Sequence, residues 1–280
     1  MLVFPRKVKP FTTAKWGETP AVQIAGGPTL HELRLTTNLA PSDIERINFI
    51  LNGDTIVTLT GEEARMLERY KKIYEVEDPE QPNYGTQVYH YVIPFADKSG
   101  KTLDGQGSSR LVTFPTDALT LEVRVREWPG GGTEPAIRLR AHARVSASEA
   151  QRLTIPRIRS INFDALVSGE NVLNTIARGP ALRRMHIRGD VSELKVLRDR
   201  LNVFEESRDG LEFELKRSGR APQDGYYHFD PVASGFVRSE QFRTASDELE
   251  FVMQVGDPGT FRILLETLEA AAVSSAEAAA

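Results

Sequence analysis

Residues 44–74 contain the most restrictive pattern in the chain, because they predict four connected elements in a row. Asn52-Gly53 suits the positive φ angles of a two-residue hairpin turn, and apolar and polar residues alternate on both sides of it. Thr60 and Glu63 then have the spacing of a helix capping box. The stretch therefore predicts a strand, a tight turn, a second strand and a capped helix. The apolar side of that helix comprises Leu67, Tyr70 and Tyr74.

A similar succession of patterns follows in the second half of the chain. Residues 182–187 predict a strand, and Asp190 with Glu193 predicts a second capping box. The alternation in residues 211–215 predicts the strand after that helix. The apolar side of this second helix would comprise Leu194, Leu197, Leu201 and Phe204.

Two further stretches repeat in the same order. Residues 226–231 resemble residues 89–94, and residues 246–253 resemble residues 116–123, in their sequence of aromatic, apolar and polar side chains. Single resemblances of this kind arise by chance, whereas several in one order indicate a duplication. The sequence therefore predicts two copies of one β-rich domain in tandem.

The repeat gives the expected domain boundaries and fold class. Each copy contains signals for about eight strands, with one helix and long loops, which suits a jelly roll better than a regular meander. The prediction is a mainly β protein of two tandem eight-stranded jelly-roll sandwiches, a double jelly roll, with short helices in the connections. The expected parts are an N-terminal arm at 1–20, a first jelly roll at 21–147, a second at 148–270 and a flexible tail at 271–280.

The N-terminal arm combines basic and aromatic residues with several prolines. This composition disfavours a helix and favours an extended segment. Basic residues beside aromatic ones suit contact with an anionic lipid surface, and they suit equally an arm that lies against a neighbouring subunit. The predicted membrane or subunit contacts are Arg6, Lys7, Lys9, Phe11, Lys15 and Trp16.

Composition excludes several classes of function. The chain has no cysteine, so disulfides, thiolate metal sites and cysteine nucleophiles are ruled out. Its formal charge of −4 argues against a surface that coats nucleic acid, and no direct nucleic-acid contact is expected. No apolar run approaches the roughly 20 residues that a membrane-spanning helix requires.

The search for catalytic residues is negative. No two of the five histidines have an HxH or HxxxH spacing, and the adjacent carboxylates point in different directions on a helix or strand. No catalytic or cofactor-binding residue is therefore predicted, and the chain is not expected to be an enzyme. Calcium is the one cofactor left open, because aspartates in or beside loops can bind it together with backbone carbonyls. Those aspartates are Asp104, Asp224, Asp230 and Asp257, and their spacing selects no ligand set.

The run INFILNGDTIVTLTGEEARMLERYK, together with the tandem β domains, resembles the major capsid proteins of tailless, membrane-containing icosahedral bacteriophages of the corticovirus type. The resemblance implies a homotrimer whose six jelly rolls form a pseudo-hexameric capsomer. Such capsomers tile the icosahedral shell of a virion over an internal membrane, and the resemblance implies that the shell is assembled in the host cytoplasm. The implied partners are neighbouring capsomers, penton and minor capsid proteins and the surface of the viral inner membrane. The resemblance also implies an association with calcium.

Two alternatives remain open from the sequence. A jelly roll that binds carbohydrate or a receptor could use Trp128, Tyr226 and Tyr227 as a platform on which sugar rings stack. An enzyme on a β-sandwich would need a metal or a carboxylate pair assembled from distant loops.

Overall fold

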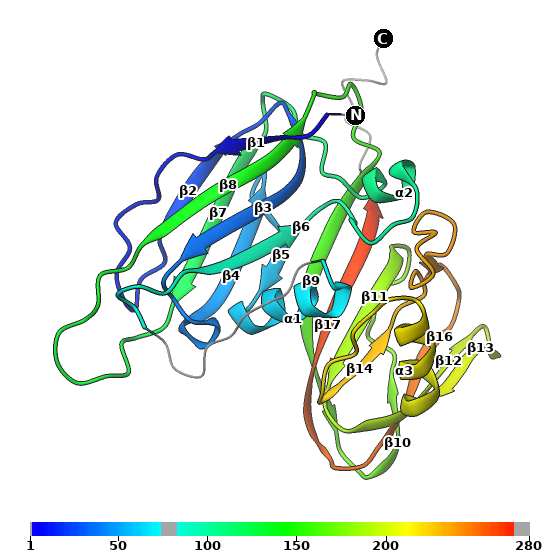
Figure 1. The fold of residues 1–280 in the computed structure, drawn as a ribbon. Coiled ribbons are helices and arrows are strands. Elements are labelled where there is room, and N and C mark those ends of the chain that lie inside the picture. Colours follow the sequence, from blue (N-terminus) through cyan, green and yellow to red (C-terminus); the bar gives the residue numbers. More distant parts are fainter. Residues whose placement is uncertain (1, 74–82, 272–280) are drawn as a thin grey trace.

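The chain folds into two β-sandwiches that lie side by side (Figure 1). The structure is a computed structural model and describes residues 2–73 and 83–271. The strands of the first sandwich are β1 (Phe4–Lys7), β2 (Ala21–Ala25), β3 (Thr29–Thr37), β4 (Ile44–Leu51), β5 (Asp54–Leu59), β6 (Tyr89–Pro94), β7 (Ala118–Val125) and β8 (Leu139–Ser146). Its short helices are η1 (Pro41–Asp43), α1 (Gly61–Lys71) and α2 (Leu103–Gly107).

The second sandwich follows after residues 147–153. Its strands are β9 (Thr154–Ala165), β10 (Gly169–Leu173), β11 (Ala181–Arg188), β12 (Val191–Arg198), β13 (Leu201–Ser207), β14 (Tyr226–Phe229), β15 (Phe242–Arg243), β16 (Leu249–Val255) and β17 (Gly259–Ala270). Its helix is α3 (Arg208–Arg217), between β13 and β14.

Both sandwiches have the same strand order. In the first, the sheet β1-β8-β3-β6 packs on β2-β7-β4-β5; in the second, β9-β17-β11-β14 packs on β10-β16-β12-β13. When the eight strands of each half are numbered in sequence, leaving out the two-residue β15, both halves read 1-8-3-6 and 2-7-4-5. This is the order of a jelly roll, and the predicted double jelly roll is confirmed.

One strand contact joins the two jelly rolls into a continuous sheet. β5 of the first runs parallel to β9 of the second, and the bridged pair is Val57 and Ile158. The contact is brief, so side chains rather than a long ladder of hydrogen bonds hold the jelly rolls together.

The pattern in residues 44–74 forms the predicted elements. Asn52 and Gly53 have φ angles of 51° and 85° and connect β4 to β5. At the start of α1, the Glu63 backbone N–H donates to the Thr60 hydroxyl and the Thr60 backbone N–H donates to the Glu63 carboxylate. Tyr74 lies outside the described residues.

The same hairpin and helix occur in the second jelly roll, displaced from where the sequence predicted them. Asp199 and Arg200 have φ angles of 51° and 66° and connect β12 to β13, and Ser207 caps α3. Both hairpins contain a β-bulge at the same position. In the first hairpin it follows the pair Phe49–Val57, and in the second it follows the pair Val196–Phe204. Val57 and Phe204 are therefore structurally equivalent.

Two predictions for the second half are wrong. The residues after Asp190 form strand β12 instead of a helix, and residues 211–215 lie in a helix instead of a strand. Leu194, Leu197 and Leu201 have helical spacing, yet they lie on β12 and β13. Of these three only Leu194 is buried and Leu201 is 70% exposed, so the leucine spacing does not mark a buried face. Bulges in both pairings of β12 also interrupt the alternation that would identify a strand. Residues 211–215 belong to α3.

The expected boundary at residue 20 is also wrong. β1 pairs antiparallel with β8 and is the first strand of the first jelly roll, and Trp16 is buried in its core. All four residues of β1 are exposed, so β1 has no alternation of buried and exposed residues that the sequence could reveal. Of the predicted tail, only Ala271 is described. None of the described helices has the length and apolar character needed to cross a membrane.

Candidate functional site

Helix α1 of the first jelly roll lies on the outer face of the sheet β9-β17-β11-β14 of the second (Figure 1). The Tyr70 ring stacks on His228 with 4.4 Å between ring centroids and meets His186 edge-on at 5.0 Å. At the end of the helix, Lys71 Nζ lies 2.9 Å from Glu266 of β17. Helix α1 therefore buries one polar side of the second jelly roll.

Arg184 of β11 is the centre of this junction and has no exposed surface. Its guanidinium contacts three carboxylates: Asp97 at 2.7 Å, Asp230 at 3.1 Å and Glu266 at 3.3 Å. Asp97 comes from the loop after β6 in the first jelly roll, while the other two come from the second. One buried cation thus connects carboxylates from both jelly rolls.

Further buried groups complete the charge balance. Arg183 donates to Asp97, Arg220 donates to Asp230, and the Tyr70 hydroxyl also donates to Asp230. We call the set Tyr70, Lys71, Asp97, Arg183, Arg184, His186, Arg220, His228, Asp230 and Glu266 the junction cluster.

The electrostatics of the junction cluster favour charged carboxylates. Burial opposes the charge of Asp97, yet Arg184, Arg183 and Lys71 hold its pKa well below the ordinary value. Burial likewise opposes the charge of Glu266, and Lys71 and Arg184 keep its pKa well below the ordinary value. Burial raises the pKa of Tyr70, and the charge of Asp230 raises it further, so the phenol stays protonated and donates.

The two histidines of the cluster form a directed chain of hydrogen bonds. The Gln223 backbone N–H donates to His228 Nε2 at 3.0 Å, so the proton of a neutral His228 lies on Nδ1. Nδ1 of His228 then donates to Nδ1 of His186 at 2.7 Å. His186 therefore carries its proton on Nε2, which lies 3.5 Å from Glu266. Every ring nitrogen is engaged, and both rings are neutral.

Burial supports the same protonation state. It lowers the pKa of His186, and it lowers the pKa of His228 well below the ordinary value. The His228 ring packs against Tyr70, His186 and Tyr226. Within residues 2–73 and 83–271, no three His, Asp or Glu side chains are placed so that they could hold one metal ion.

The junction cluster is structural rather than reactive, because its charged groups are paired with one another and closed to solvent. Moving one jelly roll relative to the other would leave buried charges without partners, which is costly. The cluster thus favours one relative orientation. Sequence reasoning missed it, although one signal was present: Arg183 and Arg184 lie between Leu182 and Met185 in β11, and Glu266 directly follows the apolar run 263–265 in β17.

The predicted contact residues of the arm do not form one surface. Arg6, Lys7, Lys9 and Lys15 are exposed, and Phe11 is half-buried against the core. Trp16 is buried, with its ring 4.8 Å from Trp128 and 5.5 Å from Tyr84 between centroids, so the prediction of a contact through Trp16 is corrected.

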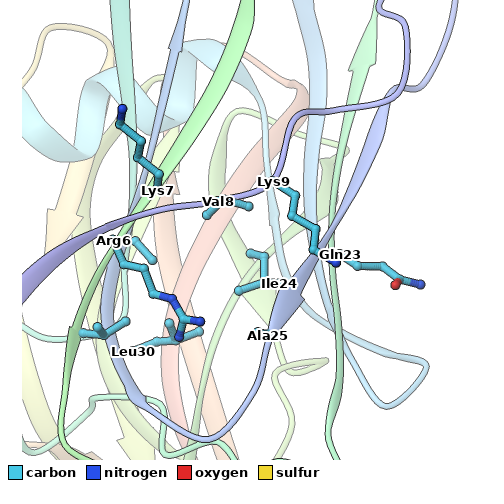
Figure 2. Close-up of a pocket in the computed structure, with 10 residues that line it drawn as sticks. Arg6, Lys7, Val8, Lys9, Gln23, Ile24, Ala25 and Leu30 are labelled. Atoms are coloured by element: carbon cyan, nitrogen blue, oxygen red, sulfur yellow. The ribbon is translucent and has the colours of Figure 1, made fainter.

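A recess of about 190 Å³ opens between β1 and β2 at the edge of the first jelly roll (Figure 2). Arg6, Lys7 and Lys9 provide its polar lining, and Ile24 and Leu30 contribute to its apolar lining. The recess exists because β1 and β2 are edge strands of the two opposing sheets, and no other strand of the described residues covers the gap between them.

Two of the four calcium candidates already have cationic partners. Asp230 is buried between Arg184 and Arg220, and Asp104 pairs with Arg238 at 2.8 Å. A buried carboxylate held by two guanidinium groups does not fit a calcium ligand. Asp224 and Asp257 are exposed in loops of the second jelly roll.

The expected aromatic platform for sugars does not form. Tyr227 is buried and its hydroxyl donates to the Glu206 carbonyl, while Tyr226 stacks on His228. Trp128 belongs to the other jelly roll and packs on Trp16 and Tyr84. These rings are engaged within the protein and are not gathered on one surface.

Comparison with solved structures finds the same fold in viral capsids. The major capsid protein P2 of bacteriophage PM2 has a TM-score of 0.82 and 15% identity, with 98% of this chain and 99% of that chain covered. A protein in the structure of Sulfolobus turreted icosahedral virus has a TM-score of 0.72 and 13% identity, covering 99% and 93%. The PBCV-1 virus capsid has a TM-score of 0.63 and 7% identity, covering 95% and 93%.

Curated protein sequences give no match to this chain. Family models do match it, one for each jelly roll. Residues 5–146 match the viral coat protein P2 N-terminal domain, and residues 155–271 match the viral coat protein P2 C-terminal domain. With nearly the whole chain matched in the order of the two domains, the chain belongs to the viral coat protein P2 family and is a coat protein of a virion capsid.

Proposed function

We propose that this coat protein forms a homotrimer with a pseudo-hexagonal outline, and that these trimers tile an icosahedral shell over an internal membrane. The observation that supports this is the identical strand order of two jelly rolls side by side in one chain. Three such chains present six similar walls, so a near-sixfold tile needs only threefold symmetry. The junction cluster supports the proposal further, because a fixed angle between the jelly rolls is a condition for a regular tile.

The trimer predicts a definite mass in solution. Light scattering coupled to size-exclusion chromatography should give three times the chain mass of 31.2 kDa. A species that stays monomeric up to the highest soluble concentration would contradict the proposal. Images of negatively stained protein should show a six-lobed outline, and a three-lobed outline would contradict the tile.

Contact with the membrane is the second part of the proposal. The exposed Arg6, Lys7, Lys9 and Lys15 would each contribute roughly 1 kcal/mol near an anionic lipid surface. Replacing these four residues with glutamine should reduce flotation with anionic liposomes and leave the weak flotation with neutral liposomes unchanged. Equal flotation of wild type and variant would show that these residues do not contact lipid.

Calcium, the penton protein and the minor capsid proteins complete the proposed set of partners. Asp224 and Asp257 are the remaining calcium candidates, because they are exposed and have no ion-pair partner among the described residues. Calcium should raise the unfolding temperature, and the variant with Asp224→Asn and Asp257→Asn should lose that increase. If the increase survives in this variant, calcium binds elsewhere.

A further inference from the structure

We propose that β13 and α3 of one chain pack against β1, β8 and β3 of a second copy of this chain, repeating between chains the contact that joins the two jelly rolls within a chain. This inference rests on the proposed trimer and names the surfaces that form it. The two surfaces lie on opposite flanks of the molecule (Figure 1), so they cannot meet within one chain.

The internal junction provides the template. Inside the chain, β5 and α1 of the first jelly roll cover the edge strand β9 and the outer face of the sheet that contains it. The equivalents of β5 and α1 in the second jelly roll are β13 and α3, and the equivalent of β9 is β1. Both β13 and β1 are edge strands without a partner on one side. Exposed edges of this kind are usually covered or blocked in native proteins.

Equivalent residues can be assigned from the strand registers. Ile158 pairs with Glu266, which pairs with Arg184 directly after a bulge in β11. In the first jelly roll, Pro5 pairs with Arg144, which pairs with Glu32 directly after the corresponding bulge in β3. Pro5 is therefore the equivalent of Ile158.

The internal bridge Val57–Ile158 thus predicts that Phe204 of one chain lies beside Pro5 of the next. Proline has no backbone N–H to donate, so side chains must carry this contact.

The residue pair next to this contact accounts for two exposed apolar side chains. Within the chain, Arg157 of β9 forms an ion pair with Asp54, the first residue after the hairpin turn. The equivalents are Phe4 and Leu201, which are 56% and 70% exposed. The ion pair within the chain thus corresponds to an apolar contact between chains, in which Phe4 of one chain would cover Leu201 of the next.

Charge complementarity points to the same contact. Lys7, Arg34 and Arg140 are exposed, lie on the outer face of the sheet β1-β8-β3-β6 and have no ion-pair partner among the described residues. On the opposite flank, Asp209 is exposed and Glu206 is half-buried, and both likewise lack an ion-pair partner in the described part of the chain. A basic face and an acidic edge favour association of two copies in one orientation.

One ion pair can be predicted individually. Within the chain, Glu62, two residues after the cap of α1, pairs with Arg188 of β11 at 2.9 Å. The equivalents are Asp209, two residues after the cap of α3, and Thr36 of β3. Thr36 pairs across the sheet with Arg140, which brings that guanidinium to the same place. Asp209 should therefore pair with Arg140 of the next chain.

The recess beside β1 fits this arrangement (Figure 2). It is open where the first jelly roll has no strand on its outer side, and β13 of a neighbouring chain would lie along its rim. The lining by Arg6 and Lys9 would face the acidic end of that strand.

The test uses the absence of native cysteine. The double variant with Phe4→Cys and Leu201→Cys is oxidised, or treated with a short bismaleimide, and analysed on a denaturing gel without reductant. The expected result is covalent trimers and no larger species, since a head-to-tail contact that closes after three chains forms a ring. The matched control pairs Phe4→Cys with Val172→Cys, which is exposed on the other edge of the same second-jelly-roll sheet, and should give no trimers.

Light scattering on the same samples tests the trimer separately from the interface proposed within it. If the protein is a trimer but the Phe4→Cys/Leu201→Cys variant is cross-linked no more than the control variant, this interface is wrong and the trimer is still supported. A monomer at every concentration would overturn both. Covalent chains longer than three would overturn the closed ring.

A charge exchange provides an independent measurement with exposed residues, whose replacement does not disturb folding. Asp209→Arg should raise the dissociation constant of the trimer about tenfold, equivalent to about 1.4 kcal/mol. Adding Arg140→Asp should restore most of the affinity, and Asp224→Arg as a control should leave it unchanged. If the second substitution weakens the trimer further, the two side chains do not meet. Loss of liposome flotation in these variants, with an unchanged trimer, would assign the basic face to the membrane instead.

Discussion

Replacing Arg184 with methionine should lower the free energy of unfolding by about 3 kcal/mol, the loss typical of a buried ion pair that loses one partner. Methionine keeps most of the apolar contacts of the arginine stem, so the loss reports the charge. Asp97, Asp230 and Glu266 would keep Arg183, Arg220 and Lys71 as partners, which limits the loss. Urea-induced unfolding followed by tryptophan fluorescence measures the change.

Two comparisons make this result specific. Arg200→Met removes an exposed guanidinium that pairs with Glu248 and should leave the unfolding midpoint unchanged. Adding Asp97→Asn to Arg184→Met should recover part of the loss, because it removes one of the carboxylates that arginine had neutralised. If Arg184→Met unfolds at the same urea concentration as the wild type, the junction cluster does not hold the two jelly rolls together.

Acidification from pH 6.5 to pH 5.5 should lower the contribution of His186 and His228 to the free energy of unfolding by about 1 to 2 kcal/mol. The pKa of each is below 6.5 in the folded protein, so the unfolded chain binds more protons in this range. Stability from these groups is therefore present above pH 6.5 and is lost as the pH falls. The lower figure corresponds to one titrating ring and the higher figure to two.

The surroundings of His186 and His228 explain why their pKa values are lowered in the folded protein. Lys71 lowers the pKa of His186, and the two rings face each other with every nitrogen engaged. Glu266 and Asp230 act in the opposite direction, but burial outweighs them. The carboxylates Asp97 and Glu266 contribute to acid unfolding only at lower pH, because their folded pKa values lie well below the ordinary ones.

Urea unfolding at pH 7.5, 6.5 and 5.5 tests this dependence. His228→Gln keeps an acceptor for Gln223 and a donor for His186, and it should reduce the pH dependence by about half. His142→Gln on the partly exposed outer face should reduce it much less. Burial raises the pKa of Glu68 to about 7, so proton uptake by this carboxyl stabilises the folded protein as the pH falls and offsets part of the loss in the wild type. The same pH dependence in His228→Gln as in the wild type would contradict neutral, buried rings.

The sequence of the first hairpin and helix predicted its structure because all the determining interactions are local. Asn52 and Gly53 supply their own positive φ angles, and Thr60 and Glu63 satisfy each other three residues apart. The duplication was likewise visible, since the alternation in β7 and β16 follows from one face of each strand being buried.

The second hairpin shows where local patterns mislead. Leu194, Leu197 and Leu201 have the spacing of a helix, and only the pairing of β12 with both β13 and β16 makes them part of a sheet. Pairing energy comes from strands distant in sequence, and bulges alter the register in a way that periodicity does not record. The same applies to β1, whose residues are all exposed and which pairs with β8 alone among the described strands.

By itself, the sequence determined that the chain would form two β-sandwiches, where the first tight turn and helix cap would lie, and which chemistries were excluded. Only the tertiary structure decided which segments of the second half are helix or strand and that the N-terminal segment is an edge strand. It also decided that charges from α1, β11, β17 and the loops after β6 and β14 meet in one buried cluster. The physical reason is the distance along the sequence between the residues that interact. Turns and caps depend on side chains a few residues apart, whereas a buried Arg184 is stable only because Asp97, Asp230 and Glu266 arrive from distant parts of the chain.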